Sequence, residues 1–251
     1  MDVAFSKYEG TGNDFIVIDD RSKAFPLLHV DVSQLCHRQR GIGADGLILL
    51  QPSQRADFSM RIFNANNTEA EMCGNGLRCL VDFLYHICGE AKTMFNIETL
   101  HKDYLCRWME QSICVEMGVP EVIYIQENEI FVNVGVPHLV VFVDDLGRFD
   151  KEVKERFLFS GVNINYAILN DIEIVMRTFE RGVERETLSC GTGATAVCCA
   201  AYKKYGLQGS IKVKFLSGEG LTFFTSIDNN KIKNICMMGQ VHHVFKGVVK
   251  I

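Results

Sequence analysis

Short apolar runs, alternating with polar residues or rich in β-branched residues, recur along most of the chain. Runs of this kind are typical of β-strands. They predict strands at residues 15–19, 46–50, 58–63, 113–117, 139–143, 166–170, 172–179, 211–216, 221–227 and 244–249. Two longer segments, 76–88 and 193–205, are apolar on nearly every side of a helix. That pattern favours helices buried inside the protein.

The order of these segments is repeated, and each half of the chain carries one copy. Residues 10–20 (GTGNDFIVIDD) resemble 135–145 (GVPHLVVFVDD), with Asn13 and His138 in corresponding positions. Further pairs are 41–45 with 161–165 and 61–65 with 177–181. An internal repeat of this length indicates two similar structural units. We therefore predict two halves, residues 1–117 with 240–251 and residues 118–239, each with strands wrapped around one helix.

A Cys-Gly-X-Gly box opens each predicted helix, at Cys73 and at Cys190. A helix N-terminus lowers the pKa of a thiol and leaves backbone N–H groups that can hold an anion. One such box is usually an ordinary turn into a helix, but two at equivalent places in a repeat favour a function. We expect two thiols facing one small acidic molecule, the arrangement that a cofactor-free racemase or epimerase needs.

Charge and composition narrow the possible partners. The 251 residues include 26 basic and 31 acidic ones, a formal net charge of −5, without a block of Lys or Arg. Nucleic acid and anionic membranes are therefore poor partner hypotheses. The chain shows neither a membrane-spanning apolar run nor a secretory signal, so we expect a cytoplasmic protein. The ten cysteines include no Cys-X-X-Cys pair, so we expect no metal site.

Two other classes of function stay open on these residues. Residues 41–46 and 191–196 satisfy the GxGxxG and GxGxxA patterns of dinucleotide binding. However, the first precedes a strand, and the second lacks an acidic residue at a strand end about twenty residues later. The other alternative is a binding module without catalysis. Faster alkylation of Cys73 and Cys190 than of the other cysteines would argue against that alternative.

Six stretches together carry a more specific signal. They are FSKYEGTGNDFIVID, RQRGIGADGLILL, FNANNTEAEMCGNGLRC, GVPHLVVFV, VNINYA and FERGVERETLSCGTGATA. In this order they resemble the diaminopimelate epimerase family, and the resemblance runs from end to end. It implies an α/β (α+β) fold of two pseudo-symmetric halves, each a β-barrel-like sheet around a central apolar helix, with the active site in the cleft between them.

The resemblance also implies an activity. Family members invert one Cα of LL-2,6-diaminopimelate to give the meso isomer, a precursor of lysine and of peptidoglycan. They use no cofactor, neither pyridoxal phosphate nor a metal, and are commonly homodimers. The expected partner is therefore a small amino-acid substrate, together with a second copy of the chain.

Site residues follow from the same resemblance, position by position. Cys73 and Cys190 would be the two acid–base groups, assisted by His138 and Glu180. The positions expected to bind substrate are Asn13, Asn64, Gly74, Asn75, Asn163, Glu180, Arg181, Gly191 and Thr192. Arg181 suits a bidentate clamp on a carboxylate. The backbone N–H groups of both boxes would receive the α-carboxylate as negative charge builds on it.

Two departures from the family concern the substrate. Val136 stands where the family usually has Asn before Pro-His, and Gly46 where some members have Gln. Each change removes one polar group from the expected site. A broader amino-acid racemase, acting on glutamate, aspartate or proline, is therefore the alternative hypothesis.

Overall fold

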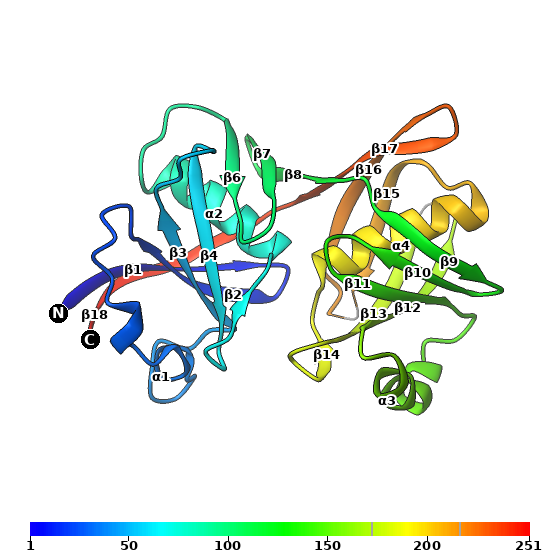
Figure 1. The fold of residues 1–251 in the computed structure, drawn as a ribbon, viewed down its shortest axis with the longest axis horizontal. Helices are drawn as coiled ribbons and strands as arrows, with labels where there is room; N and C mark the ends of the chain where they lie inside the picture. Colours follow the sequence, from blue (N-terminus) through cyan, green and yellow to red (C-terminus); the bar gives the residue numbers. More distant parts are fainter. Residues whose placement is uncertain (172, 216) are drawn as a thin grey trace. The chain divides into compact units, whose positions relative to one another are not determined.

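The computed structural model describes residues 1–171, 173–215 and 217–251. It divides into two compact units (Figure 1). The first comprises Met1–Val115 and Gly239–Ile251, and the second comprises Glu116–Met238. The end of the chain belongs to the first unit because its last strand pairs with the first strand, and the Ile251 amide donates to the Met1 carbonyl.

The first unit contains strands from the N-terminal part of the chain together with the last strand. These are β1 (Asp2–Gly10), β2 (Asn13–Asp19), β3 (Gly46–Gln51), β4 (Phe58–Asn64), β5 (Glu69–Ala70), β6 (Met94–Glu98), β7 (Asp103–Met109) and β18 (His242–Lys250). Its helices are η1 (Leu27–His29), α1 (Val32–Cys36) and α2 (Gly74–His86). Strand β8 (Ser112–Gly118) begins in this unit and ends in the second.

The second unit repeats this plan. Its strands are β9 (Glu121–Gln126), β10 (Glu129–Asn133), β11 (Pro137–Phe142), β12 (Asn163–Asn170), β13 (Glu173–Glu180), β14 (Arg185–Thr187), β15 (Gly209–Phe215), β16 (Gly220–Asp228) and β17 (Lys231–Gly239). Its helices are α3 (Arg148–Ser160) and α4 (Gly191–Tyr205).

Strand pairing shows that the two units share one topology. The first follows the order β18–β1–β2–β3–β4–β6–β7–β8, in which β2–β3 and β4–β6 are parallel and the other pairs antiparallel. The second follows β9–β10–β11–β12–β13–β15–β16–β17, with β11–β12 and β13–β15 parallel. The short strands β5 and β14 pair with β4 and β13. The predicted pseudo-symmetric α/β fold is therefore confirmed.

An ion pair occupies the same place in both sheets. Arg61 on β4 makes a bidentate pair with Glu69 on β5, with N···O distances of 2.7 and 2.8 Å. Arg177 on β13 does the same with Glu186 on β14, at 2.7 Å for both bonds. Each acid lies four residues before its Cys-Gly-X-Gly box, so equivalent pairs tie each box to its sheet.

Strand register shows which residues of the two units are structurally equivalent, and it corrects the alignment taken from the sequence repeat. One row of paired residues runs Ile16, Leu47, Phe63 and Glu69, and its counterpart runs Leu139, Ile164, Phe179 and Glu186. His138 therefore takes the place of Phe15, and Asn13 that of Val136. The expected equivalence of Asn13 and His138 is wrong by two residues. A shift of two keeps every side chain on the same face, so hydrophobic alternation cannot detect it.

The two long apolar helices are the centres of their units. Helix α2 contacts β1, β2, β3, β4, β7 and β18, and α4 contacts β10, β11, β12 and β16. Figure 1 shows each helix lying across its own set of strands. Residues of α4 such as Ala194, Ala196, Ala200 and Ala201 are fully buried. Small side chains of this kind let strands pack close to the helix. The sequence of α4 has no polar face over most of its length, and this pattern predicts a buried helix.

Both helices begin two residues earlier than predicted, at Gly74 and Gly191, because each cysteine is the N-cap. Most predicted strands fall on observed ones, although Ile172 and Leu216 lie outside the described residues. The apolar pattern did not predict α3, whose buried face is formed by Phe149 and Val153 among many charged residues. It also did not predict β1, where polar Ser6 and Lys7 are buried.

Candidate active site

The two predicted thiols occupy the same structural position in their units. Cys73 and Cys190 both have extended backbone at the N-cap, with φ of −143° and −137°. The Cys73 Sγ accepts a hydrogen bond from Gly76 N at 3.4 Å, and the Cys190 Sγ one from Gly193 N at 3.3 Å. Cys73 is partly exposed, whereas Cys190 is 5% exposed. Each sulfur thus lies in the partial positive field of a helix N-terminus.

Polar groups surround the Cys73 box within the first unit. The Asn13 amide lies at the start of β2, with its Nδ2 4.0 Å from the Cys73 Sγ. Asn75, in the first turn of α2, is buried and accepts from Arg78 Nη2 at 2.6 Å. The same Nη2 donates to Thr11 Oγ1 at 2.8 Å. Arg78, which the sequence analysis did not single out, is fully buried and joins the box to the β1–β2 turn.

A different set of polar groups surrounds the Cys190 box. The Thr192 hydroxyl lies 3.4 Å from the Cys190 Sγ. His138, at the start of β11, is fully buried and contacts the amide of Asn165 on β12. A Cβ added at Gly193 would lie 2.4 Å from the Asn165 Oδ1 and 3.2 Å from the Cys190 Sγ. The structure thus connects His138 to the Cys190 box through Asn165.

His138 is held as a neutral imidazole. Burial, as the larger cause, and the positive charge of Arg181 together lower the pKa of His138 to about 3. Near neutral pH the ring therefore carries a single proton.

The remaining predicted residues lie at strand ends. Asn163 donates to the Pro137 carbonyl and accepts from the Arg181 amide, both at 3.0 Å, so it holds the start of β11 near the end of β13. Glu180 accepts a hydrogen bond from the Thr187 hydroxyl. Arg181 is exposed.

Asn64 and the box glycines complete the predicted set. Asn64 ends β4 and donates to Thr68 Oγ1 within its own turn, at 3.0 Å. Gly74 and Gly191 are buried in the first turns of α2 and α4. The structure thus brings Asn13 to Cys73, Thr192 to Cys190 and Asn163 to Arg181.

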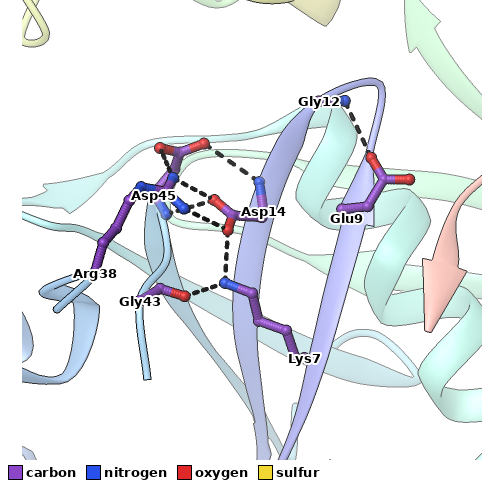
Figure 2. A network of polar contacts seen from close by, with 7 residues as sticks. All are labelled: Lys7, Glu9, Gly12, Asp14, Arg38, Gly43 and Asp45. Carbon is purple, nitrogen blue, oxygen red and sulfur yellow. Dashed lines mark hydrogen bonds and ion pairs between the residues drawn. The ribbon is translucent and has the colours of Figure 1, made fainter. Parts of the chain in front are cut away.

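A charged network joins β1, the start of β2 and the loop that precedes β3 (Figure 2). Arg38 holds both oxygens of Asp14 at 2.8 and 2.9 Å and also reaches Asp45 at 2.9 Å. The buried Lys7 ammonium donates to Asp14 Oδ2 at 2.6 Å and to the Gly43 carbonyl. Asp14 directly follows Asn13 and Asp45 directly precedes Gly46, so the network holds both site positions in place.

The network shifts the pKa values of its two acids in opposite directions. Burial acts to raise the pKa of Asp14, but hydrogen bonds from Arg38 and Lys7 outweigh it and hold that pKa well below its usual range. Burial and the neighbouring Asp14 carboxylate raise the pKa of Asp45. Asp14 is therefore ionised near neutral pH and is the charged centre of the network.

The box glycines give a matched pair of stability tests. A Cβ at Gly76 would meet the terminal methyl of Ile48 at 3.0 Å, whereas one at Gly193 would meet the Asn165 Oδ1 at 2.4 Å. Asn165 is held by three hydrogen bonds and cannot move aside as a methyl group can. We expect Gly193→Ala to lower the free energy of unfolding by roughly 1–3 kcal/mol and Gly76→Ala by less. Urea unfolding of both variants measures this, and equal losses would contradict it.

Among residues 1–171, 173–215 and 217–251, no group of three or more His, Cys, Asp or Glu side chains is arranged to hold a metal ion. In the same part of the chain, no helix has the length and apolar character needed to cross a membrane.

Comparison with known sequences decides the family. The family model for diaminopimelate epimerase matches residues 5–123 and 130–244. The chain belongs to the diaminopimelate epimerase family. It is 39% identical to the diaminopimelate epimerase of Flavobacterium psychrophilum, over 97% of this chain and 98% of that protein. It is 34% identical to that of Desulforapulum autotrophicum, over the full length of both. The family predicted from the sequence is confirmed, and with it the isomerase class.

Solved structures with the same fold include more distant proteins. A phenazine biosynthesis protein of the PhzF family from Bacillus anthracis matches with a TM-score of 0.79 and 15% identity, over the full length of both chains. A hydroxyproline epimerase from Agrobacterium vitis, with bound trans-4-hydroxy-L-proline, matches with a TM-score of 0.73 and 14% identity. This match covers 99% of this chain and 91% of that one. At such identities the likeness concerns the fold alone.

Proposed function

We propose that this protein is a cofactor-independent epimerase that converts LL-2,6-diaminopimelate to meso-2,6-diaminopimelate, in the synthesis of lysine and peptidoglycan precursors. One observation carries the proposal. Two thiols, Cys73 and Cys190, are the N-caps of equivalent buried helices in two units of the same topology. Membership of the diaminopimelate epimerase family supports the choice of substrate.

Inversion at one carbon needs a base on one face and an acid on the other. In the proposed reaction, one cysteine thiolate removes the proton from Cα, and the other cysteine thiol gives its proton to the opposite face. The electron pair of the broken C–H bond is held as a carbanion between the two steps. After one turnover the protonated and deprotonated cysteines have exchanged roles, and so the enzyme is ready for the reverse reaction.

Stabilisation of the carbanion is the main task of the site. Backbone N–H groups of the Gly74-Asn75 and Gly191-Thr192 turns would receive the α-carboxylate as charge builds on it. Preorganised donors of this kind contribute roughly 3–4 kcal/mol each in other enzymes. Arg181 would clamp a carboxylate, with Asn13, Asn64, Asn163 and Glu180 as further substrate contacts. His138 would assist as a neutral group.

A broader racemase activity is the second candidate, and the two departures from the family favour it. Val136 offers an apolar side chain beside Pro137, where the family usually has Asn. Gly46 offers none, and a Cβ there would lie 2.7 Å from the Phe63 carbonyl oxygen. Because this backbone admits only glycine at position 46, a polar side chain cannot replace the missing contact. The distal amino-acid end of diaminopimelate would thus be held by fewer groups.

Deuterium incorporation tests both candidates. Reduced protein is mixed with LL-diaminopimelate in D₂O, and NMR follows deuterium at Cα while chiral chromatography follows the meso isomer. We expect both to appear together, because the proton returned to Cα comes from a solvent-equilibrated thiol. Exchange with glutamate, aspartate or proline at a comparable rate would favour the racemase instead. Failure with all four substrates would contradict the two-thiol mechanism.

Resemblance to the family also leads to two proposals about the protein in the cell, its oligomeric state and its location. We propose that it works as a homodimer in the cytoplasm, without membrane or nucleic-acid partners. Its net charge of −5 supports the absence of such anionic partners. Light scattering of the purified protein at micromolar concentration tests the dimer, and a monomer mass with full activity would contradict it.

A further inference from the structure

The residues behind the two cysteine boxes differ sharply, although the backbones are equivalent. In the first unit, a Cβ at Gly76 would meet Ile48 and Ile62. In the second, the register places Asn165 in the position of Ile48 and Thr178 in that of Ile62. His138 likewise replaces Phe15. Three apolar positions of one half are thus a connected polar group in the other, and all three of its members are at most 2% exposed.

Asn165 is the centre of this group. Its Nδ2 donates to the Leu139 carbonyl at 3.1 Å and lies 3.1 Å from His138 Nδ1. Its Oδ1 accepts from Thr178 Oγ1 at 3.1 Å. A backbone carbonyl only accepts, so the contact with Leu139 establishes which end of the amide carries the hydrogens. The orientation of the side chain is therefore determined by its partners.

This orientation sets the state of His138. An amide nitrogen only donates, so His138 Nδ1 must accept the bond and cannot carry a proton. In the neutral ring the single proton then lies on Nε2. The buried Nε2 has no hydrogen-bond partner in the part of the chain that the structure describes. A buried donor without an acceptor is unfavourable, so a ligand that brings an acceptor would stabilise this arrangement of the ring.

We propose that Asn165 is a positioning residue that holds His138 as the Nε2–H tautomer, so that His138 offers one fixed N–H donor to a carboxylate oxygen of the bound amino acid. The inference rests on the proposed function and deepens it. His138 takes no proton from the substrate in this scheme, because its acceptor nitrogen is occupied by Asn165. The proton transfers stay with the two cysteines, and the Cys190 side gains an imidazole donor at a position where the first unit has Phe15.

Ring NMR of the resting protein tests the tautomer without any substrate. Reduced protein carries ¹³C- and ¹⁵N-labelled histidine, and the His138 signals are those lost in His138→Gln. We expect the Nε2–H tautomer throughout pH 5 to 8. Asn165→Asp, which has the same size but only accepts, should move the proton to Nδ1 or charge the ring. Asn165→Leu removes the donor and should give a tautomer mixture, should the aspartate variant fail to fold.

Steady-state kinetics then test whether catalysis uses the His138 Nε2–H donor. A wrong histidine tautomer lowers kcat by up to about 10⁴-fold in serine proteases, so we expect at least a tenfold loss of kcat in Asn165→Asp. Thr178→Val is the matched control, because it removes a bond to Oδ1 but leaves the amide donor. It should lower stability while the tautomer stays the same and kcat falls much less.

Two results would overturn the proposal. One is an Nδ1–H tautomer or a charged ring in the parent protein at pH 7. The other is a parent-like kcat in Asn165→Asp with its tautomer changed. Failure of the proposed function looks different, because the parent would then turn over no amino acid while its His138 signals still report the Nε2–H state.

Discussion

Replacing Cys73 or Cys190 with serine is expected to lower epimerisation by about 10³-fold or more while the helices stay capped. Serine is a good N-cap, so its hydroxyl can accept the bond from Gly76 or Gly193 in place of sulfur. A hydroxyl is a far weaker acid than a thiol, however, and cannot supply the base. Loss of one acid–base group alone costs about 10²–10⁴-fold, and inversion needs both.

The measurement combines activity with unfolding. Meso-diaminopimelate formation and Cα deuterium are followed for both serine variants, and urea unfolding gives their stability. Cys73→Ala and Cys190→Ala should lose activity to the same extent but also lose the cap, at about 1 kcal/mol each. Cys88→Ser, just beyond α2, is the control thiol and should keep parental activity. A serine variant within tenfold of the parent would contradict the two-thiol mechanism.

Asp14→Asn is expected to lower the free energy of unfolding by about 2–4 kcal/mol, since removing one partner of a buried pair leaves the other charge uncompensated. The Lys7 ammonium, 7% exposed, would keep neutral oxygens as acceptors, the Gly43 carbonyl and the new amide, but would lose the carboxylate that balances its charge. Arg38 is 60% exposed and would turn to water or Asp45. The loss therefore comes chiefly from Lys7.

Two further variants separate these contributions. Arg38→Gln should cost less than about 1 kcal/mol, because exposed ion pairs are weak. Lys7→Met combined with Asp14→Asn should recover much of the loss, because no buried charge then remains unpaired. Urea unfolding at pH 7 measures all three proteins. An Asp14→Asn variant as stable as the parent, or a double variant no better than the single one, would contradict this account.

The pH dependence has a definite sign. The folded pKa of Asp14 is depressed, so its contribution is complete above the ordinary aspartate pKa of about 4 and is lost as the pH falls below it. The stability difference between the parent and Asp14→Asn should therefore be constant near neutral pH and shrink in acid. A difference that grew in acid would show that Asp14 is not held as a carboxylate.

Much of the fold could be predicted from local sequence. Alternating apolar runs identify most strands, and two helices apolar on nearly every side identify the centre of each unit. The repeat and the paired boxes predict two similar units with a thiol at each helix start, and longer stretches predict the diaminopimelate epimerase family. These features succeed because hydrophobic period, capping and short motifs act over a few neighbouring residues.

Register and buried polar contacts required the tertiary structure. The strand ladders place His138 opposite Asn163 and in the position of Phe15, a correspondence that the repeat misses by two residues. Asn165 is a polar residue between the apolar residues Ile164 and Tyr166 of β12. That position was the sequence signal that could have identified it as a buried polar residue. Its partners His138 and Thr178, and its neighbour Gly193, come from other segments of the chain.

Most of the elements, the duplication and the two thiols could be read from residue type and short spacing alone. Which charges and amides meet depends instead on the folded chain, as with Lys7, Asp14 and Arg38 or with Asn165 and His138. Such contacts join residues brought together by strand pairing. Their energies depend on distance and burial, which no local pattern in the chain encodes.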